Sequence, residues 1–243
     1  MSPTALPKRA VIALPSQRIA IEGGMYEGHD SGLFIIEAQH PFNVLKAAGY
    51  EVAFSSENGE WYPDWVSEQA QFLSGADLAA YNDLSSPFRK ALAAIRPASE
   101  LKSADYAIFF AAAGHAALLD FPTATNLHQL ATEIYAHGGV VAAVCQGGCI
   151  LGGITDADGK SLITGHEVTG FTEIGEHQMG VFDTLRSWNK PTVRDLAQQL
   201  GGTYVAPAGP WEVLVIPQGR LVTGANPQSA GAAAEAAIKA LHA

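Results

Sequence analysis

The chain has little of what marks disulfide-stabilised, zinc-binding and membrane-spanning proteins. It has only two cysteines, Cys145 and Cys149, with no Cys-x-x-Cys pair and no cysteine and histidine cluster at metal-ligand spacing. We therefore expect no disulfide framework, no bound metal, and a reducing, cytoplasmic location. No run of about eighteen uncharged apolar residues occurs, and the first residues lack a long apolar segment. Neither a membrane span nor a signal peptide is expected.

Basic residues are also scarce. Lysine and arginine number 14 against 24 acidic residues, a net charge of −10, and the acidic residues are spread along the chain. A negative surface repels phosphate backbones and anionic lipids, so neither nucleic acid nor membrane is an expected partner. With 243 residues, 48% of them hydrophobic, and no internal repeat or linker, the chain predicts a single domain spanning residues 1–243.

Strand and helix patterns alternate along most of the chain. This alternation predicts an α/β fold with a doubly wound parallel sheet. Shorter strands follow, including a hairpin that turns at Gln218 and Gly219. The expected strands are 9–16, 51–59, 105–115, 140–144 and segments of 161–171, 203–209 and 211–224; the expected helices are 32–50, 125–139 and 230–243.

Residues 60–100 interrupt this alternation. They contain aromatic residues, turn residues and two short helical patterns, which is more than a crossover between strands needs. We interpret them as an insertion that caps the sheet. Its aromatic side chains either line a wall of the substrate pocket or fill the cap, packing being favoured; they are Trp61, Tyr62, Trp65 and Phe72.

A cysteine stands where an apolar strand meets a run of glycines, in VVAAVCQGGCILGGI (140–154). The glycines permit a tight turn directly into a helix, so Cys145 is expected at a strand-to-helix elbow. The first N–H groups of that helix favour a thiolate, which predicts a nucleophile. The alternative is a cysteine that only packs, as Cys149 is expected to do.

An acidic residue lies within an apolar helical pattern, in GLFIIEAQHPF (32–42). Glu37 follows Leu33 and Phe34 by four and three positions and so shares their inward face. A buried, unpaired carboxyl group stays protonated and can donate a hydrogen bond to a nearby thiolate, which makes Glu37 a candidate partner of Cys145. Alternatively, Glu37 points to solvent. Pro41 predicts that the helix bends or begins nearby.

A second loop, FFAAAGHAALLDFP (109–122), follows another strand. It carries Gly114 and His115 at the carboxyl edge of the sheet, where ligands of α/β proteins bind. Backbone N–H groups here and after Cys145 are candidates for an oxyanion site, and His115 is a candidate proton relay. The alternative for His115 is a loop residue without a chemical role.

Taken together, these segments resemble the ThiJ/PfpI superfamily, and within it the branch of heat-shock chaperones and glutathione-independent glyoxalases (glyoxalase III). The resemblance implies a flavodoxin-like sandwich, related to class I glutamine amidotransferases, with an inserted cap. It also implies a homodimer, a small-molecule substrate and no cofactor. The segments that carry it are GLFIIEAQHPFNVL, GADLAAYNDLSSPF, FFAAAGHAALLDFP, AAVCQGGCILGGITDADGKSLITGHEVTGFTEIGE and APAGPWEVLVIPQGRLVTGANPQSA.

The resemblance places the family's nucleophile on Cys145, its helix acid on Glu37, and the glutamate that orients its catalytic histidine on Glu176. That histidine normally follows the cysteine, but this chain has Gln146 there. An amide has no proton that titrates near neutral pH, so it cannot act as a general acid or base. Three explanations remain open. His115 or His177 takes over, Glu37 makes both proton transfers, or the reaction has changed, as in the related isocyanide hydratases.

The leading hypothesis is an enzyme in which Cys145 attacks an electrophilic carbon of an α-oxoaldehyde, a related carbonyl compound or an isonitrile. Glu37 would move the proton, while the N–H groups of Gly114 and Gln146 would steady developing negative charge. The alternative is a stress protein that acts as a holdase or senses peroxide through Cys145. Protease activity is disfavoured without a histidine beside the cysteine.

Overall fold

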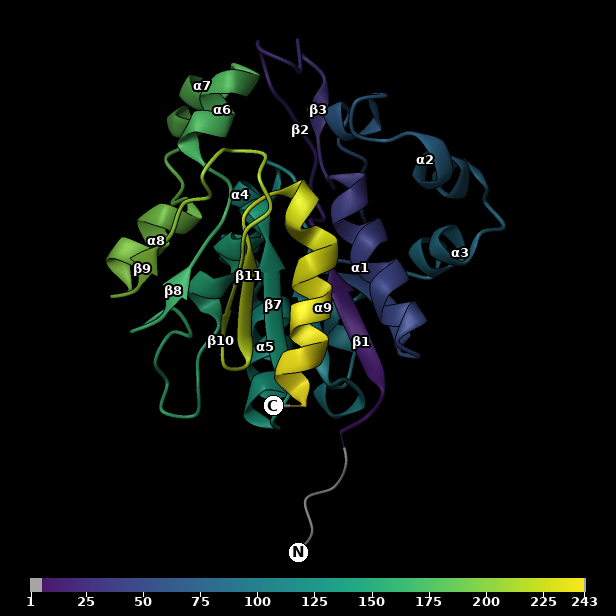
Figure 1. Cartoon of the computed structure of the whole chain (residues 1–243), viewed down its shortest axis with the longest axis vertical. Coiled ribbons are helices and arrows are strands. Elements are labelled where there is room, and N and C mark those ends of the chain that lie inside the picture. The colour runs from purple at the N-terminus through teal and green to yellow at the C-terminus, as the bar shows by residue number, and fades with distance from the viewer. Residues whose placement is uncertain (1–5, 243) are drawn as a thin grey trace, which may run out of the picture.

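A seven-stranded sheet forms the centre of the molecule (Figure 1). The computed structural model describes residues 6–242. The strand order is β10-β11-β7-β6-β1-β4-β5, and all neighbours are parallel except the β10–β11 hairpin, whose turn contains Gly219 at φ +60°. The strands are β1 (Arg9–Ala13), β4 (Glu51–Ser56), β5 (Arg96–Pro97), β6 (Ile108–Ala111), β7 (Val140–Val144), β10 (Val215–Gln218) and β11 (Leu221–Gly224).

The central strands are apolar throughout because helices cover both faces of the sheet. All residues of β6 and β7 are buried, which explains why neither strand alternates between polar and apolar positions. On one face lie α1 (Ile35–Ala47) and α9 (Ala230–Leu241), and on the other lies α5 (Thr125–Ala136) (Figure 1). The predicted fold class is therefore confirmed, and these three helices fall within their predicted ranges.

Short elements gather beyond the carboxyl ends of the strands. The hairpin of β2 (Ile19–Ala20) and β3 (Asp30–Ser31) and the pair α6 (Glu173–Met179) and α7 (Phe182–Ser187) lie at this end of the molecule (Figure 1). Further along are α8 (Val193–Gln199) and the small sheet of β8 (Glu167–Val168) and β9 (Thr203–Tyr204).

The helices between residues 173 and 199 were not predicted. Each is only two turns or less, too short to show a clear apolar period. Two of them depend on threonine caps: Thr172 accepts a hydrogen bond from Gly175 N–H, and Thr192 forms a reciprocal capping box with Asp195.

The expected insertion at 60–100 contains the two predicted short helices, α2 (Gly75–Asn82) and α3 (Pro87–Ala93), beside α1 (Figure 1). Its end differs from the expectation, because β5 joins the main sheet as an edge strand beside β4. The remaining elements are α4 (Ala117–Asp120) and the 3₁₀ helices η1 (Val66–Glu68), η2 (Ala98–Glu100), η3 (Ser103–Asp105), η4 (Phe121–Thr123), η5 (Cys145–Gly153) and η6 (Pro227–Ser229).

Among residues 6–242, no helix combines the length and apolar character needed to cross a bilayer.

Candidate active site

Cys145 is the first residue of η5 and occupies a strained turn directly after β7. Its φ is +57°, in the left-handed region that side chains with a Cβ rarely adopt, at a cost of about 1–2 kcal/mol. The turn packs closely on β6, since a Cβ on Gly147 would lie 2.5 Å from the Ala111 carbonyl oxygen. The predicted elbow is therefore present, although the element that follows is a 3₁₀ helix. Strain of this kind concentrates at functional sites.

A small cavity opens above the Cys145 side chain. It encloses about 260 Å³ of empty space, including solvent at its mouth, and only 6% of Cys145 is exposed. Apart from His115 and Gln146 its wall is apolar or sulfur-containing, and none of the described residues that line it is a lysine or arginine. The lining residues are Phe34, Gly114, His115, Cys145, Gln146, Phe171, Met179, Trp211 and Pro227.

Glu37 lies in the first turn of α1 with its side chain fully buried. Its Oε2 accepts a hydrogen bond from Ala113 N–H at 3.0 Å, while Oε1 has no hydrogen-bond partner of good geometry among the described residues. Burial raises the pKa of this carboxyl well above its usual range, although interaction with the Cys145 thiol and the Ala113 N–H opposes the rise. The predicted inward position of Glu37 is confirmed, and the fold brings it to Cys145. The helix continues past Pro41.

The Cys145 thiol is not the ready thiolate that the helix N–H groups alone suggest. Burial, followed by the neighbouring Glu37 carboxyl, raises the pKa of Cys145 well above that of an ordinary cysteine. The Gln146 N–H acts in the opposite direction but is the weaker influence. Because a thiolate and a carboxylate repel each other in this enclosed site, the sulfur can become negative only when Glu37 carries a proton.

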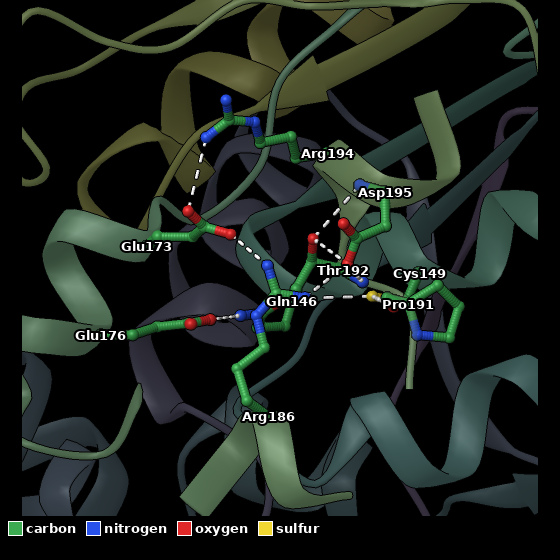
Figure 2. Close-up of polar contacts among 9 residues, drawn as sticks. All are labelled: Gln146, Cys149, Glu173, Glu176, Arg186, Pro191, Thr192, Arg194 and Asp195. Carbon is green, nitrogen blue, oxygen red and sulfur yellow. Dashed lines mark hydrogen bonds and ion pairs between the residues drawn. The ribbon is translucent and has the colours of Figure 1, made fainter. Parts of the chain in front are cut away.

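Gln146 occupies the position next to the cysteine and is 1% exposed. Its Nε2 donates to Glu176 Oε1 at 2.6 Å, and its Oε1 faces the Cys149 Sγ at 3.9 Å (Figure 2). Burial raises the pKa of Glu176 to about 7. Gln146 and Glu176 are therefore paired beside Cys145 as the sequence comparison implies, with an amide where an imidazole is expected.

Arg186 of α7 links α6, which carries Glu176, to α8. It forms ion pairs with Glu173 of α6 and, at 2.9 Å, with Asp195 of α8 (Figure 2). Arg194 also pairs with Glu173, at 3.4 Å. None of the residues in these ion pairs lines the cavity, so they support the helix that carries Glu176 from outside it.

Gly114 and His115 lie on the opposite wall. A Cβ on Gly114 would be 2.3 Å from the Gly32 carbonyl oxygen, so glycine is required for the loop before α1 to approach. His115 is 5% exposed, and burial lowers its pKa to about 4, which keeps the ring neutral. Its Nδ1 lies 3.0 Å from the Tyr26 hydroxyl, and its Nε2 has no partner within the described chain.

Other sequence candidates lie elsewhere. His177 is exposed and stacks on Phe182 with ring centroids 3.9 Å apart, away from the cavity wall. Four aromatic residues of the insertion were expected either to line the substrate pocket or to fill the cap. None of them lines the cavity; they are Trp61, Tyr62, Trp65 and Phe72. Phe72 instead packs behind the wall against Phe34 and Trp211.

Several wall residues were missed by sequence reasoning, as were two buried residues behind His115. The wall residues Phe171, Met179, Trp211 and Pro227 come from segments with no local signal of a site. Tyr26 and Asp64 sit between turn residues, and only the fold shows that the Tyr26 hydroxyl donates to Asp64 at 2.7 Å. Phe171, Trp211 and Pro227 do lie within segments that carry the family resemblance, but nothing in those segments marks them as wall residues.

Within residues 6–242, no group of three or more histidine, cysteine, aspartate or glutamate side chains is placed to hold a metal ion.

The fold is of the ThiJ/PfpI type. A ThiJ/PfpI domain protein from Brachyspira murdochii shares the fold, with a TM-score of 0.61 at 12% identity over 98% of each chain. The crystal structure of glyoxalase III from Candida albicans is much more similar, with a TM-score of 0.92 at 41% identity over 96% of each chain. Glutathione-independent glyoxalase HSP31 of Saccharomyces cerevisiae is 45% identical over 97% of this chain and 98% of its own. The chain belongs to the family of glutathione-independent glyoxalases. No protein-family model matches it.

Proposed function

We propose that this protein is a glutathione-independent glyoxalase that converts small 2-oxoaldehydes, such as methylglyoxal, into 2-hydroxy acids. Its relatives carry that name, and their similarity extends over almost the whole chain. The observation that carries the proposal is the buried pair of Cys145, which lines the cavity, and Glu37, whose carboxyl group interacts with the Cys145 thiol. A thiol and a carboxyl group that share a proton supply both a nucleophile and an acid.

The reaction begins with transfer of the Cys145 proton to the Glu37 carboxylate. The sulfur then attacks the aldehyde carbon, and Glu37 returns the proton to the aldehyde oxygen, giving a hemithioacetal. Moving the hydrogen of that carbon to the neighbouring carbonyl carbon converts the adduct into a 2-hydroxyacyl thioester. Water cleaves the thioester and the thiol takes up a proton, so the balance is oxoaldehyde plus water to hydroxy acid. The N–H groups of Gly114 and Gln146 would steady the oxygen during attack.

The cavity favours substrates that are small and uncharged. Its volume is below the usual range of pockets for drug-sized ligands. An anionic substrate would find no lysine or arginine on the described wall, and would meet the buried acids Glu37 and Glu176 close by. We propose methylglyoxal and similar short oxoaldehydes as the substrate class.

We retain the remaining expectations as part of this proposal. They are a single domain, a homodimer, cytoplasmic location and a reaction without cofactor. An isonitrile hydratase is the second candidate activity, because Gln146 removes the imidazole next to the nucleophile. Peroxide sensing is less favoured, since burial raises the pKa of the Cys145 thiol and hides it from solvent.

The test is formation of lactate from methylglyoxal, without glutathione, by the purified protein and by two serine variants. Cys145→Ser should lose activity by at least about 10²-fold, since a hydroxyl is a far poorer nucleophile here. Cys149→Ser is the matched control, because the Cys149 sulfur donates to the Pro191 carbonyl behind the cavity and should be dispensable. Activity that survives in Cys145→Ser would exclude the mechanism, and conversion of isonitriles alone would favour the second candidate.

A further inference from the structure

A buried chain of hydrogen bonds leads away from the cavity behind His115. Tyr26, Ser31 and Asp64 are fully buried, and all lie outside the elements that carry Cys145 and Glu37. The Tyr26 hydroxyl lies 2.7 Å from Asp64 Oδ2 and 3.0 Å from His115 Nδ1. Ser31 Oγ donates to the same Asp64 oxygen at 2.6 Å, and Ser67 N–H donates to Oδ1 at 3.0 Å.

The direction of these hydrogen bonds determines which ring nitrogen of His115 carries the proton. An ionised Asp64 can only accept, so Tyr26 donates its single proton to Asp64. The contact between Tyr26 and His115 then requires a proton on Nδ1. In a neutral imidazole this leaves Nε2 bare. Nε2 is buried without a partner, on a residue that lines the cavity with Cys145 and Gln146.

We propose that His115 is a second proton-transfer residue of the site, and that Asp64 and Tyr26 are positioning residues that keep its Nε2 free to accept. This inference rests on the proposed function. Once Cys145 has formed the hemithioacetal, Nε2 takes the proton from the former aldehyde carbon, the C–H electron pair forms a carbon–carbon double bond, and the neighbouring carbonyl oxygen becomes negative, giving an enediolate. The imidazolium then returns the proton to the adjacent carbon, while the hydroxyl proton on the former aldehyde carbon passes to the neighbouring oxygen, giving the thioester. One carbon is oxidised and its neighbour reduced, so no external electron acceptor is needed.

The buried groups around His115 suit this role. The cation formed during transfer would donate from Nδ1 to Tyr26, which in turn donates to the negative Asp64. The negative charge of Asp64 raises the pKa of Glu37, and Cys145 acts on the pKa of Tyr26 in the same direction. On the cavity side the Phe171 ring packs against the His115 ring, with the two ring centroids 6.1 Å apart.

The first test replaces His115 by Asn, whose amide can still donate to Tyr26 but lacks the second nitrogen. We expect kcat to fall about 10²- to 10⁴-fold with little change in KM, as for loss of a general base. The rate of Cys145 alkylation by iodoacetamide should stay as in the wild type. His177→Asn, on the exposed histidine, is the matched control and should keep full activity. Full turnover by His115→Asn would overturn this inference but would not contradict the role of Cys145 as nucleophile. That role is tested separately by the loss of activity in Cys145→Ser.

The second test uses Asp64→Asn to reverse the direction of the hydrogen bonds from His115 through Tyr26 to residue 64. Ser67 N–H cannot turn, so the Asn oxygen must face it, which puts the Asn NH₂ where Oδ2 now accepts from Tyr26. Tyr26 must then donate to His115 Nδ1 and push the ring proton to Nε2. Nitrogen-15 NMR of the histidine rings above pH 7 should find Nδ1–H in the wild type and Nε2–H in Asp64→Asn, with kcat lost as in His115→Asn. An Nε2–H tautomer in the wild type would overturn the inference.

Discussion

At the scale of single residues, burial is the factor that governs the site. Glu37, Cys145 and Glu176 are all acids whose pKa is raised mainly by removal from water. His115 is a base whose pKa is lowered to about 4 by the same cause. Burial therefore opposes charge on each of these groups, and proton transfer between close neighbours, such as Cys145 and Glu37, replaces exchange with solvent.

Substitution of Gln146 tests whether the remaining residues of the site can support glyoxalase activity. Its Nε2 already donates to Glu176 at 2.6 Å, so an imidazole in its place would find an acceptor ready to orient it. We expect Gln146→His to raise kcat for methylglyoxal by about 10-fold or more, because it adds a titratable group beside Cys145. Gln146→Asn, another amide, should give no gain.

Steady-state kinetics of the two variants provides the measurement. An unchanged kcat in Gln146→His, with the protein folded, would indicate that the cavity serves a substrate other than an oxoaldehyde.

At the scale of secondary-structure elements, the elbow depends on close packing between η5 and β6. Gly147 lies so near Ala111 that an added Cβ would be 2.5 Å from a backbone oxygen, which cannot move aside. Gly152, in the same 3₁₀ helix, faces only the end of the Leu196 side chain at 3.2 Å. The two glycines therefore differ in what an added methyl group would meet.

We expect Gly147→Ala to lower the free energy of unfolding by about 2 kcal/mol or more, through overpacking that shifts the backbone at Cys145. Gly152→Ala should stay within about 1 kcal/mol of the wild type. Urea unfolding of the three proteins gives the comparison. Equal stability of the two variants would contradict the tight contact between the elbow and β6.

The elements that were predictable from sequence are those with long apolar patterns. The strands predicted at 140–144 and 9–16, the helix with Glu37 and the closing helix follow from periodicity and glycine positions. The helices α6, α7 and α8 did not, because caps such as Thr172 and tertiary ion pairs such as Arg186 with Asp195 stabilise them. Periodicity also missed β5, which has two residues and pairs with β4 only at its end.

The candidate site was predictable only where the sequence signal is local. Cys145, Glu37 and His115 each follow a strand or lie within an amphipathic helix, so their place at the carboxyl edge could be expected. Tyr26 and Asp64 are 38 positions apart in irregular segments, and they meet only because the β2–β3 hairpin folds over the same edge. No short-range pattern reports such a contact.

At the scale of the whole molecule, the buried neutral His115 makes stability depend on pH. Its pKa is about 4 in the folded protein and about 6.5 when unfolded. The unfolded chain therefore binds a proton more readily, so this contribution is present above pH 6.5 and is lost as the pH falls toward 4. The raised pKa values of Glu37, Asp64 and Glu176 act in the opposite direction.

A comparison of variants isolates the histidine. Between pH 7.5 and 4.5 we expect the wild type to lose about 2 to 3 kcal/mol more stability than His115→Asn, from the difference in pKa. Denaturant unfolding at both pH values measures this, with the exposed His177→Asn as control, which should follow the wild type. Parallel losses in wild type and His115→Asn would show that the ring is not buried in neutral form.

The most direct test of the proposed function looks for the bond between substrate and sulfur. Acid quenching during turnover of methylglyoxal, followed by peptide mapping by mass spectrometry, should find a 2-hydroxyacyl group on Cys145 and none on Cys149. Alkylation of Cys145 by iodoacetamide should abolish both this adduct and lactate formation. Undiminished lactate formation by protein whose Cys145 is fully alkylated would contradict the mechanism.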